Sequence, residues 1–289
     1  MGDVITLSYE VVDVFTDRPF TGNPLAVVFG AERLATEQMQ TITREFSLSE
    51  TIFVLPPTVP EATYRARIFT PAHELPFAGH PSVGAAVTQV RRGLIKAGDA
   101  LMECGAGLLP IHVEEAGRAT VTGATPTVGD EVDPGDLLAA VGLTRADYAG
   151  PPLRWAGCGL AFPYLSVVPD AVARAVIPLP QIVDSIVVFA WDAERRESHT
   201  RVMSPGHGVP EDPATGSAAL GFGVWLVASG LLPGDGLSQY TVKQGLEIHR
   251  PSTLECSVNA VAGKAVQATV SGHVVPIASG EIAIPPFVG

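Results

Sequence analysis

The stretch ELPFAGHPSVGAAVTQVRRGL, residues 74–94, returns at residues 211–231 as EDPATGSAALGFGVWLVASGL. Each copy is a turn rich in Pro and Gly that opens into an apolar run of helical length. A repeat this long is typical of a duplicated half-protein, because solenoid repeats span about 20–50 residues. Aligned without a gap, the copies share Glu74/Glu211, Pro76/Pro213, Gly79/Gly216, Gly84/Gly221, Val87/Val224, Val90/Val227 and a closing Gly-Leu.

The sequence around each copy is duplicated as well. Residues 68–71 (IFTP) are echoed by residues 202–205 (VMSP), so a strand is expected to lead into each turn. Farther along, ATVTG at 119–123 is echoed by ATVSG at 268–272. The other expected strands have few helices between them, which favours antiparallel sheets. The predicted fold is therefore α+β, with two pseudo-symmetric lobes, each a mainly antiparallel curved sheet or barrel around a central helix.

The length of the chain also favours two lobes. Its 289 residues exceed the usual single-core size of roughly 250. Residues 126–152 are acidic and punctuated by Gly and Pro, and we interpret them as a linker that holds one short helix. We expect the first lobe to span residues 1–125 and the second 126–277, with the strand at 278–289 a candidate to return to the first lobe.

Composition excludes several classes of partner. The formal net charge of −12 argues against nucleic acid and against an anionic membrane surface. No run of 18 apolar residues is uninterrupted, and the first residues lack the pattern of a secretory signal. The three Cys are too few and too scattered for a disulfide framework. We expect a cytoplasmic protein.

The two turns are the first candidate for a site. Free backbone N–H groups and the dipole at a helix start can bind an anion. If a pseudo-twofold axis relates the lobes, both helix starts converge on one cleft and can bind a carboxylate or phosphate there. The copies differ at two polar positions, because His80 is matched by Ser217 and Leu75 by Asp212. Such differences indicate that a symmetric cleft has been specialised.

Glu50 lies at an expected junction between a helix and a strand. It follows an expected helix at residues 36–46 and precedes an expected strand at 52–55, with Ser49 and Thr51 on either side. The residues that follow this position are apolar, and its immediate neighbours carry small hydroxyl groups.

Four segments, taken in order, resemble the phenazine-biosynthesis PhzF-like family over essentially the whole chain. They are Gly22-Asn23-Pro24, Leu48-Ser49-Glu50-Thr51, Phe77-Ala78-Gly79-His80-Pro81 and Glu211-Asp212-Pro213-Ala214-Thr215-Gly216-Ser217-Ala218-Ala219. The resemblance implies the two-lobed fold of diaminopimelate epimerase and a cofactor-independent isomerase, usually a homodimer. Such an enzyme moves a proton within a small, often cyclic, amino acid or related carboxylate.

The resemblance also implies roles for individual residues. Glu50 would be the general acid/base, assisted by His80 and Asp212. The implied substrate-binding positions are Asn23, Gly79, Pro81, Thr215, Gly216 and Ser217. Each has a plainer interpretation, since Asn23 can be a turn residue, Asp212 an anion that stabilises a helix start and Ser217 a cap.

Other chemistries find less support in the sequence. Diaminopimelate epimerase and proline racemase, which share this architecture, use paired cysteines at the two helix starts. Neither turn contains Cys here, so two-thiol racemisation is not expected. The His residues are not at metal-ligand spacing, and no nucleotide-binding glycine motif is present, so we expect no metal and no cofactor. Two alternatives stay open, which are a non-catalytic binder of small carboxylates and an epimerase with Glu50 and Asp212 as opposed bases.

Overall fold

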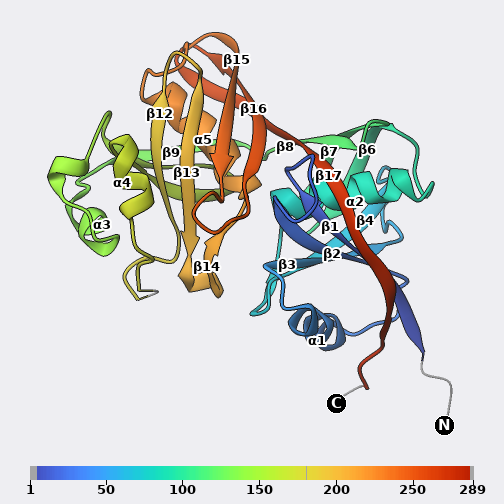
Figure 1. The fold of residues 1–289 in the computed structure, drawn as a ribbon. Coiled ribbons are helices and arrows are strands. Elements are labelled where there is room, and N and C mark those ends of the chain that lie inside the picture. The colour runs from blue at the N-terminus through green and yellow to red at the C-terminus, as the bar shows by residue number, and fades with distance from the viewer. Residues whose placement is uncertain (1–4, 180, 287–289) are drawn as a thin grey trace. The chain divides into compact units, whose positions relative to one another are not determined.

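The computed structural model describes residues 5–179 and 181–286. The chain divides into two compact lobes. Of the described residues, the first lobe contains 5–121 and 272–286, and the second contains 122–179 and 181–271 (Figure 1). The first boundary lies at 121/122 where the sequence suggested 125/126, and the return to the first lobe begins at 272 instead of 278.

In the first lobe the sheet closes on itself, in the strand order β1-β2-β3-β4-β6-β7-β8-β17 and back to β1. The pairs β2–β3 and β4–β6 are parallel, and the pairs β1–β2, β3–β4, β6–β7, β7–β8 and β1–β17 are antiparallel. The elements of this lobe are β1 (Thr6–Val14), β2 (Asn23–Phe29), α1 (Thr36–Phe46), β3 (Glu50–Leu55), β4 (Tyr64–Phe69), β5 (Glu74–Leu75), α2 (Gly79–Arg91), β6 (Gly98–Cys104), β7 (Gly107–Glu114), β8 (Arg118–Thr122) and the end of β17 (Lys264–Ala283).

Helix α2 is the centre of the first lobe. Residues 79–89 are all buried, and the helix packs on β1, β2, β3 and β7. A helix without a polar face is stable only inside a core. Helix α1 is different, because it is amphipathic. It buries Met39 and Ile42 against Phe53 and Phe69, on the face of the sheet that does not contact α2.

The second lobe repeats this plan with the strand order β9-β10-β11-β12-β13-β15-β16-β17. The pairs β11–β12 and β13–β15 are parallel, and the others in this order are antiparallel. The elements are β9 (Pro126–Val132), α3 (Gly135–Ala140), η1 (Arg145–Asp147), β10 (Leu153–Cys158), β11 (Leu160–Ser166), α4 (Pro169–Arg174), β12 (Ile186–Asp192), β13 (Glu197–Ser204), η2 (Pro205–His207), β14 (Val209–Asp212), α5 (Gly216–Ala228), β15 (Gly236–Gln244) and β16 (Ser252–Val261).

The interpretation of residues 126–152 as a linker is wrong. Residues 126–132 form strand β9, which pairs with β10, and Leu138 and Val141 enter a core cluster of the second lobe. Strand β9 is exposed along nearly its whole length. It therefore lacks the alternation of apolar and polar residues from which a strand is recognised in a sequence.

Helix α5 is the centre of the second lobe, and residues 216–227 are all buried. Trp225 and Phe222 pack on Tyr164 and Phe189. The hydroxyl of Tyr164 donates a hydrogen bond to the carbonyl oxygen of Ala218 at 2.7 Å. A Cβ at Gly221 would lie 2.5 Å from that hydroxyl oxygen, so glycine is needed for the helix to approach the sheet.

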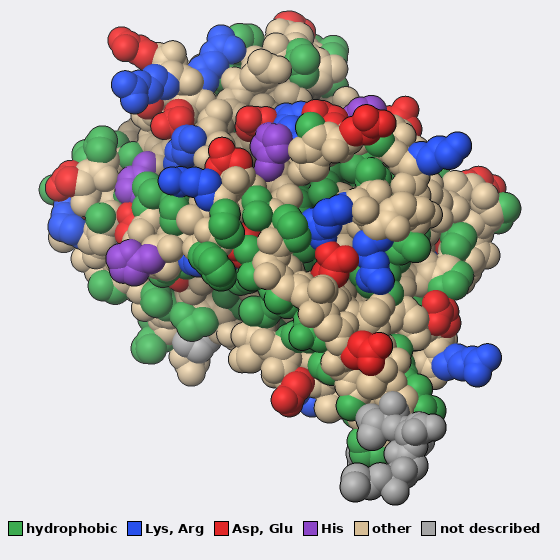
Figure 2. Space-filling view, turned by 45° about the vertical axis from the view of Figure 1, so that its right-hand side comes forward, with side chains coloured by type: hydrophobic (Ala, Val, Ile, Leu, Met, Phe, Trp, Pro, Cys, Tyr) green, Lys and Arg blue, Asp and Glu red, His purple; other side chains and the backbone are tan. Residues whose placement is uncertain are grey.

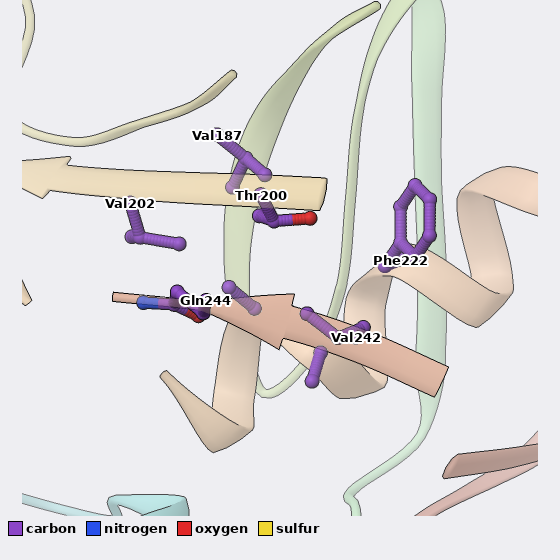
Figure 3. Close-up of a pocket in the computed structure, with 8 residues that line it drawn as sticks. Val187, Thr200, Val202, Phe222, Val242 and Gln244 are labelled. Atoms are coloured by element: carbon purple, nitrogen blue, oxygen red, sulfur yellow. The ribbon is translucent and has the colours of Figure 1, made fainter. Parts of the chain in front are cut away.

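A narrow, mostly apolar pocket lies between α5 and the strands β12, β13 and β15 (Figure 3). Val187 on β12, Val202 on β13 and Val242 on β15 line it, and Gln244 and Phe222 lie at opposite ends of it in Figure 3.

The duplication seen in the sequence is a duplication of structure. In the first lobe β4, β5, α2 and β6 follow one another, and β4 pairs in parallel with β6. In the second lobe β13, β14, α5 and β15 do the same, and α2 and α5 are both 13 residues long. The prediction of two similar α+β lobes, each a sheet around a buried helix, is confirmed.

Strand β17 belongs to both sheets. Residues 264–271 pair with β16 and residues 274–283 pair with β1. The sequence suggested two separate segments here, the repeated ATVSG at 268–272 and a returning strand at 278–289. One continuous strand forms because the segment between them, which includes Val274 and Pro276, also pairs with β1.

The surface mixes charges of both signs. On the face shown in Figure 2, acidic and basic side chains are interspersed among apolar ones. Among the described residues, none of the helices has both the length and the apolar character needed to cross a membrane.

Candidate active site

The first lobe brings together Glu50, His80 and Asn23. Asn23 begins β2 and Glu50 begins β3, and because these strands are parallel with Leu25 opposite Glu50, their starts lie side by side. His80 is the second residue of α2, which packs on both strands. Nδ1 of His80 lies 3.2 Å from Oε2 of Glu50 and 3.3 Å from Nδ2 of Asn23.

Ser49 fixes the orientation of Asn23. Its hydroxyl donates to Oδ1 of Asn23 at 3.0 Å, which leaves the amide nitrogen facing His80. Asn23 is fully buried. The amide nitrogen of Asn23 therefore faces the imidazole of His80 inside the protein.

His80 is neutral. Its side chain is only 4% exposed, and burial lowers the pKa of its imidazole to about 3 because a charged ring would lose its hydration. Nε2 is buried and has no hydrogen-bond partner among the described residues. Glu50 retains some access to solvent, with 15% of its side chain exposed. The arrangement places a neutral imidazole beside a carboxyl group that is partly exposed to solvent.

The protonation state of His80 can be measured directly. Because its pKa lies well below the ordinary value of about 6.5, its ring resonances in an NMR titration are expected to stay constant from pH 8 to pH 5. A His80→Asn variant assigns the resonance. A chemical-shift change centred near pH 6.5 would contradict the neutral assignment.

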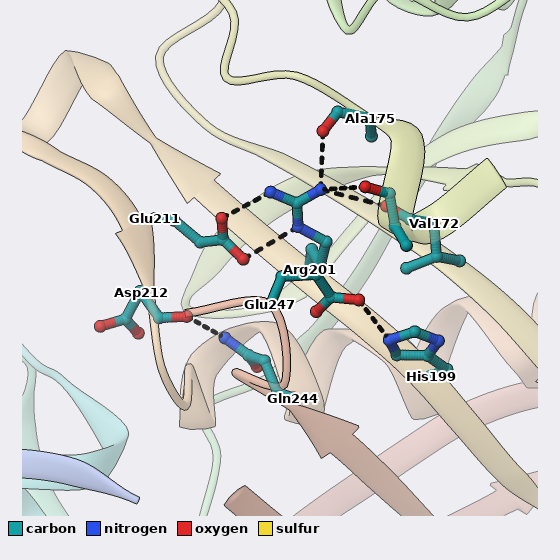
Figure 4. Close-up of polar contacts among 9 residues, drawn as sticks. Val172, Ala175, His199, Arg201, Glu211, Asp212, Gln244 and Glu247 are labelled. Atoms are coloured by element: carbon teal, nitrogen blue, oxygen red, sulfur yellow. Dashed lines mark hydrogen bonds and ion pairs between the residues drawn. The ribbon is translucent and has the colours of Figure 1, made fainter. Parts of the chain in front are cut away.

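The second lobe brings together Asp212, Thr215 and Gln244. Asp212 ends β14, Thr215 is the N-cap of α5, and Gln244 ends β15. The hydroxyl of Thr215 donates to Oδ2 of Asp212 at 2.6 Å. The amide nitrogen of Gln244 donates to the carbonyl oxygen of Asp212 at 2.7 Å (Figure 4).

Glu211, the neighbour of Asp212, is held by Arg201 of β13. The guanidinium binds both carboxylate oxygens, with Nε at 2.9 Å and Nη2 at 2.7 Å (Figure 4). Nη1 donates to the carbonyl oxygens of Val172 and Ala175 at the end of α4, at 3.1 and 2.6 Å. The hydrogen bonds to Glu211 raise the pKa of Arg201. The pair fixes β14, and with it the backbone that carries Asp212.

The first lobe has the same pair at the equivalent position. Arg67 precedes the IFTP segment as Arg201 precedes VMSP, and it binds both carboxylate oxygens of Glu74, at 2.7 and 2.6 Å. Sequence reasoning noticed the repeated glutamate and missed its arginine partner. The missed signal was an Arg one residue before each echoed strand segment.

Both helix starts have the character expected of an anion site. Gly79 and Gly216 are the first residues of α2 and α5, and neither helix has a side chain that caps its N-terminus. The next residues, His80 and Ser217, are buried, and so is Pro81. Neither N-cap side chain therefore satisfies the N–H groups of the helical turn that follows it.

The described part of the chain has no group of three or more His, Cys, Asp or Glu side chains that could hold a metal ion. The pair formed by His199 and Glu247, with Nε2 2.8 Å from Oε1, supplies two such groups (Figure 4).

Comparison with known proteins gives the family. A family model described as "Phenazine biosynthesis-like protein" matches residues 12–280. The chain belongs to this PhzF family. It is similar to an uncharacterized isomerase of Mesorhizobium japonicum, with 36% identity over 96% of this chain and 99% of the relative. It is also similar to trans-2,3-dihydro-3-hydroxyanthranilate isomerase of Pseudomonas aeruginosa, with 34% identity over 94% of this chain and 98% of the relative.

Solved structures agree. The crystal structure of a PhzF family protein from Bacillus anthracis superposes with a TM-score of 0.85 and 29% identity, over 97% of this chain and 100% of that one. The resemblance and the fold suggested by the sequence are confirmed, and this PhzF family chain is an isomerase.

The thiols of this PhzF family chain allow a chemical test. Cys158 and Cys256 are buried, and burial raises the pKa of Cys158 to about 12 and that of Cys256 as well. Cys104 is half-buried, with a raised pKa. Iodoacetamide at pH 8 is expected to modify Cys104 slowly and the other two after denaturation, because the thiolate is the reactive form. Isomerase activity should survive alkylation of Cys104 in the folded protein. A loss of activity at the same rate as alkylation would instead support a mechanism that uses a thiol.

Proposed function

We propose that the chain moves a proton within a small, possibly cyclic, amino acid or related carboxylate, with Glu50 as the general acid/base. One observation carries this proposal, which is the carboxyl of Glu50 lying 3.2 Å from a buried, neutral imidazole. A carboxyl so placed can take a proton from carbon and return it to another carbon. Positioned acid–base groups contribute about 10²–10⁴-fold to such steps.

His80 is suited to both protonation states of Glu50. With its ring proton on Nε2, Nδ1 accepts a hydrogen bond from the protonated carboxyl. With the proton on Nδ1, the ring donates to the carboxylate. The amide of Asn23 also faces Nδ1 and favours the tautomer with the proton on Nε2, in which the amide and the protonated carboxyl share the lone pair of Nδ1. The imidazole can therefore stabilise the protonated carboxyl of Glu50 by accepting a hydrogen bond. The imidazole stays neutral throughout.

We propose that the substrate carboxylate binds at backbone N–H groups of the helix starts, around Gly79, Gly216 and Ser217. Asp212 is proposed to take part in the same reaction. The uncapped first turns of α2 and α5 support this assignment. A preorganised donor of this kind is worth about 3–4 kcal/mol where charge develops in a transition state.

The substrate class can be tested with one candidate and one contrast. The Pseudomonas aeruginosa relative is named for trans-2,3-dihydro-3-hydroxyanthranilate, a cyclic amino acid, and this compound is the first to incubate with the chain. Proline and 4-hydroxyproline are the contrast, because they would reveal stereochemical inversion. NMR detects a double-bond shift, and polarimetry detects inversion.

The competing function is a binder that has lost turnover. Calorimetric titration with the same compounds separates the two functions. A ligand that binds and is recovered unchanged, with no exchange of carbon-bound hydrogen in deuterated water, would replace the isomerase proposal by the binder. Loss of optical rotation without a double-bond shift would favour the two-base epimerase.

A further inference from the structure

Gln244 directs its side-chain amide oxygen and both amide hydrogens to the turn that carries Asp212. Oε1 accepts from the backbone N–H of Thr215 at 3.1 Å. The nitrogen donates to the carbonyl oxygen of Asp212 at 2.7 Å and to the hydroxyl oxygen of Thr215 at 3.0 Å. Gln244 is 1% exposed, so water does not compete for these bonds.

These contacts determine the direction of a chain of hydrogen bonds. A backbone N–H can meet only an acceptor, so Thr215 fixes which end of the amide is oxygen. The amide nitrogen must then donate to the hydroxyl of Thr215. A hydroxyl that already accepts from an amide directs its single hydrogen elsewhere, and here that is Oδ2 of Asp212 at 2.6 Å.

The local backbone is built to allow this approach. Gly245, directly after Gln244, has a φ of +78°, which an L side chain rarely adopts. A Cβ there would lie 2.7 Å from the carbonyl oxygen of Pro213 and 2.3 Å from that of Arg250. Glycine therefore lets the end of β15 lie against the turn between Asp212 and Thr215.

The first lobe provides an internal comparison. There the turn before α2 has Leu75 at the position of Asp212, and a backbone bond holds it, from the N–H of Ala106 to the carbonyl oxygen of Pro76 at 3.0 Å. The buried amide belongs to the copy of the turn that carries the carboxylate. The first-lobe turn is held without a buried amide. We therefore connect Gln244 with the carboxylate of Asp212, which only the second-lobe turn carries.

We propose that Gln244 is a positioning residue for the isomerisation, acting through the hydroxyl of Thr215 to hold the carboxylate of Asp212 in one orientation. This inference rests on the proposed function, in which Asp212 takes part. It also gives Thr215 a positioning task in place of direct substrate binding.

The test is an isosteric change of polarity. Gln244→Glu keeps an acceptor for the N–H of Thr215 but replaces the donor with a second acceptor, toward which the Thr215 hydroxyl can turn. We expect kcat to fall by about 10- to 100-fold, with a much smaller change in KM. Gln239→Glu is the matched control, because Gln239 lies exposed on the same strand and the charge change is identical. It should leave kcat unchanged.

Two variants of Thr215 keep the test decisive if Gln244→Glu does not fold. Thr215→Val removes the hydroxyl with little change of shape and should reproduce the loss of kcat, whereas Thr215→Ser should restore most of it. A Gln244→Glu/Thr215→Val double variant that folds should be no slower than Thr215→Val, because one path carries both effects. Equal kcat for the Val and Ser variants would overturn the proposal.

The turnover of two variants, Glu50→Gln and Gln244→Glu, distinguishes a wrong positioning role from a wrong proposed function. If wild type turns over and Glu50→Gln does not, while Gln244→Glu retains the wild-type kcat, the positioning role is wrong and the proton-transfer role of Glu50 stands. If Glu50→Gln retains full turnover, the proposed function itself is wrong.

Discussion

Replacement of Glu50 by Gln is expected to lower kcat by about 10²–10⁴-fold, the usual contribution of a positioned general acid/base. The change preserves the shape of the side chain and removes its capacity to carry a proton between carbons. His80, whose pKa is lowered to about 3, cannot supply the missing base by charging and discharging near neutral pH. Steady-state kinetics measures the effect, and circular dichroism establishes that the variant is folded.

Glu45→Gln is the matched control for this variant. Glu45 lies exposed near the end of α1, close in sequence to Glu50, and the change in charge is the same. Its kcat should equal that of wild type. If Glu50→Gln is as active as Glu45→Gln, Glu50 is not the acid/base.

Replacement of Arg201 by Met is expected to cost about 3–5 kcal/mol of unfolding free energy. Arg201 and Glu211 have side chains only 8% and 4% exposed, so losing the guanidinium leaves a buried carboxylate without its counter-ion. The carbonyl oxygens of Val172 and Ala175 lose their donor as well. Urea unfolding followed by Trp fluorescence reports on this lobe, because Trp155, Trp191 and Trp225 all lie in it.

The internal repeat supplies the control. Arg67→Met removes the equivalent ion pair of the first lobe, where Arg67 and Glu74 are 17% and 37% exposed. Water can hydrate the remaining carboxylate there, so the expected cost is about 0–1 kcal/mol, measured by far-UV circular dichroism. Equal losses for Arg67→Met and Arg201→Met would contradict the assignment of the second pair as a buried one.

The fold could be predicted because its decisive features are local or repeated. The two turns can be identified in the sequence because Gly79 and Gly216 are each followed by an apolar run long enough for a buried helix. Strand β9 could not be found in this way, since it lies exposed and is held by backbone pairing with β10. Backbone pairing with a distant strand does not constrain the residue types of an exposed segment, so its sequence shows no strand pattern.

The candidate site was predictable in part. Glu50, His80 and Asp212 were selected from motifs, and the structure adds the contact between the first two. Their supports, Arg201 and Gln244, were not found. Each reaches its partner from a separate strand. Arg201 is marked only by the repeat, because an Arg precedes both echoed strand segments, and Gln244 has no such counterpart in the repeat.

The central claim is that Glu50 carries a proton from one carbon of the substrate to another. Its most direct test is the fate of deuterium placed on the carbon that loses hydrogen, followed through a single turnover in ordinary water by NMR and mass spectrometry. The account predicts isomerised product with part of the label at the receiving carbon, and no such product from Glu50→Gln. Isomerised, labelled product formed by Glu50→Gln at the wild-type rate would contradict it.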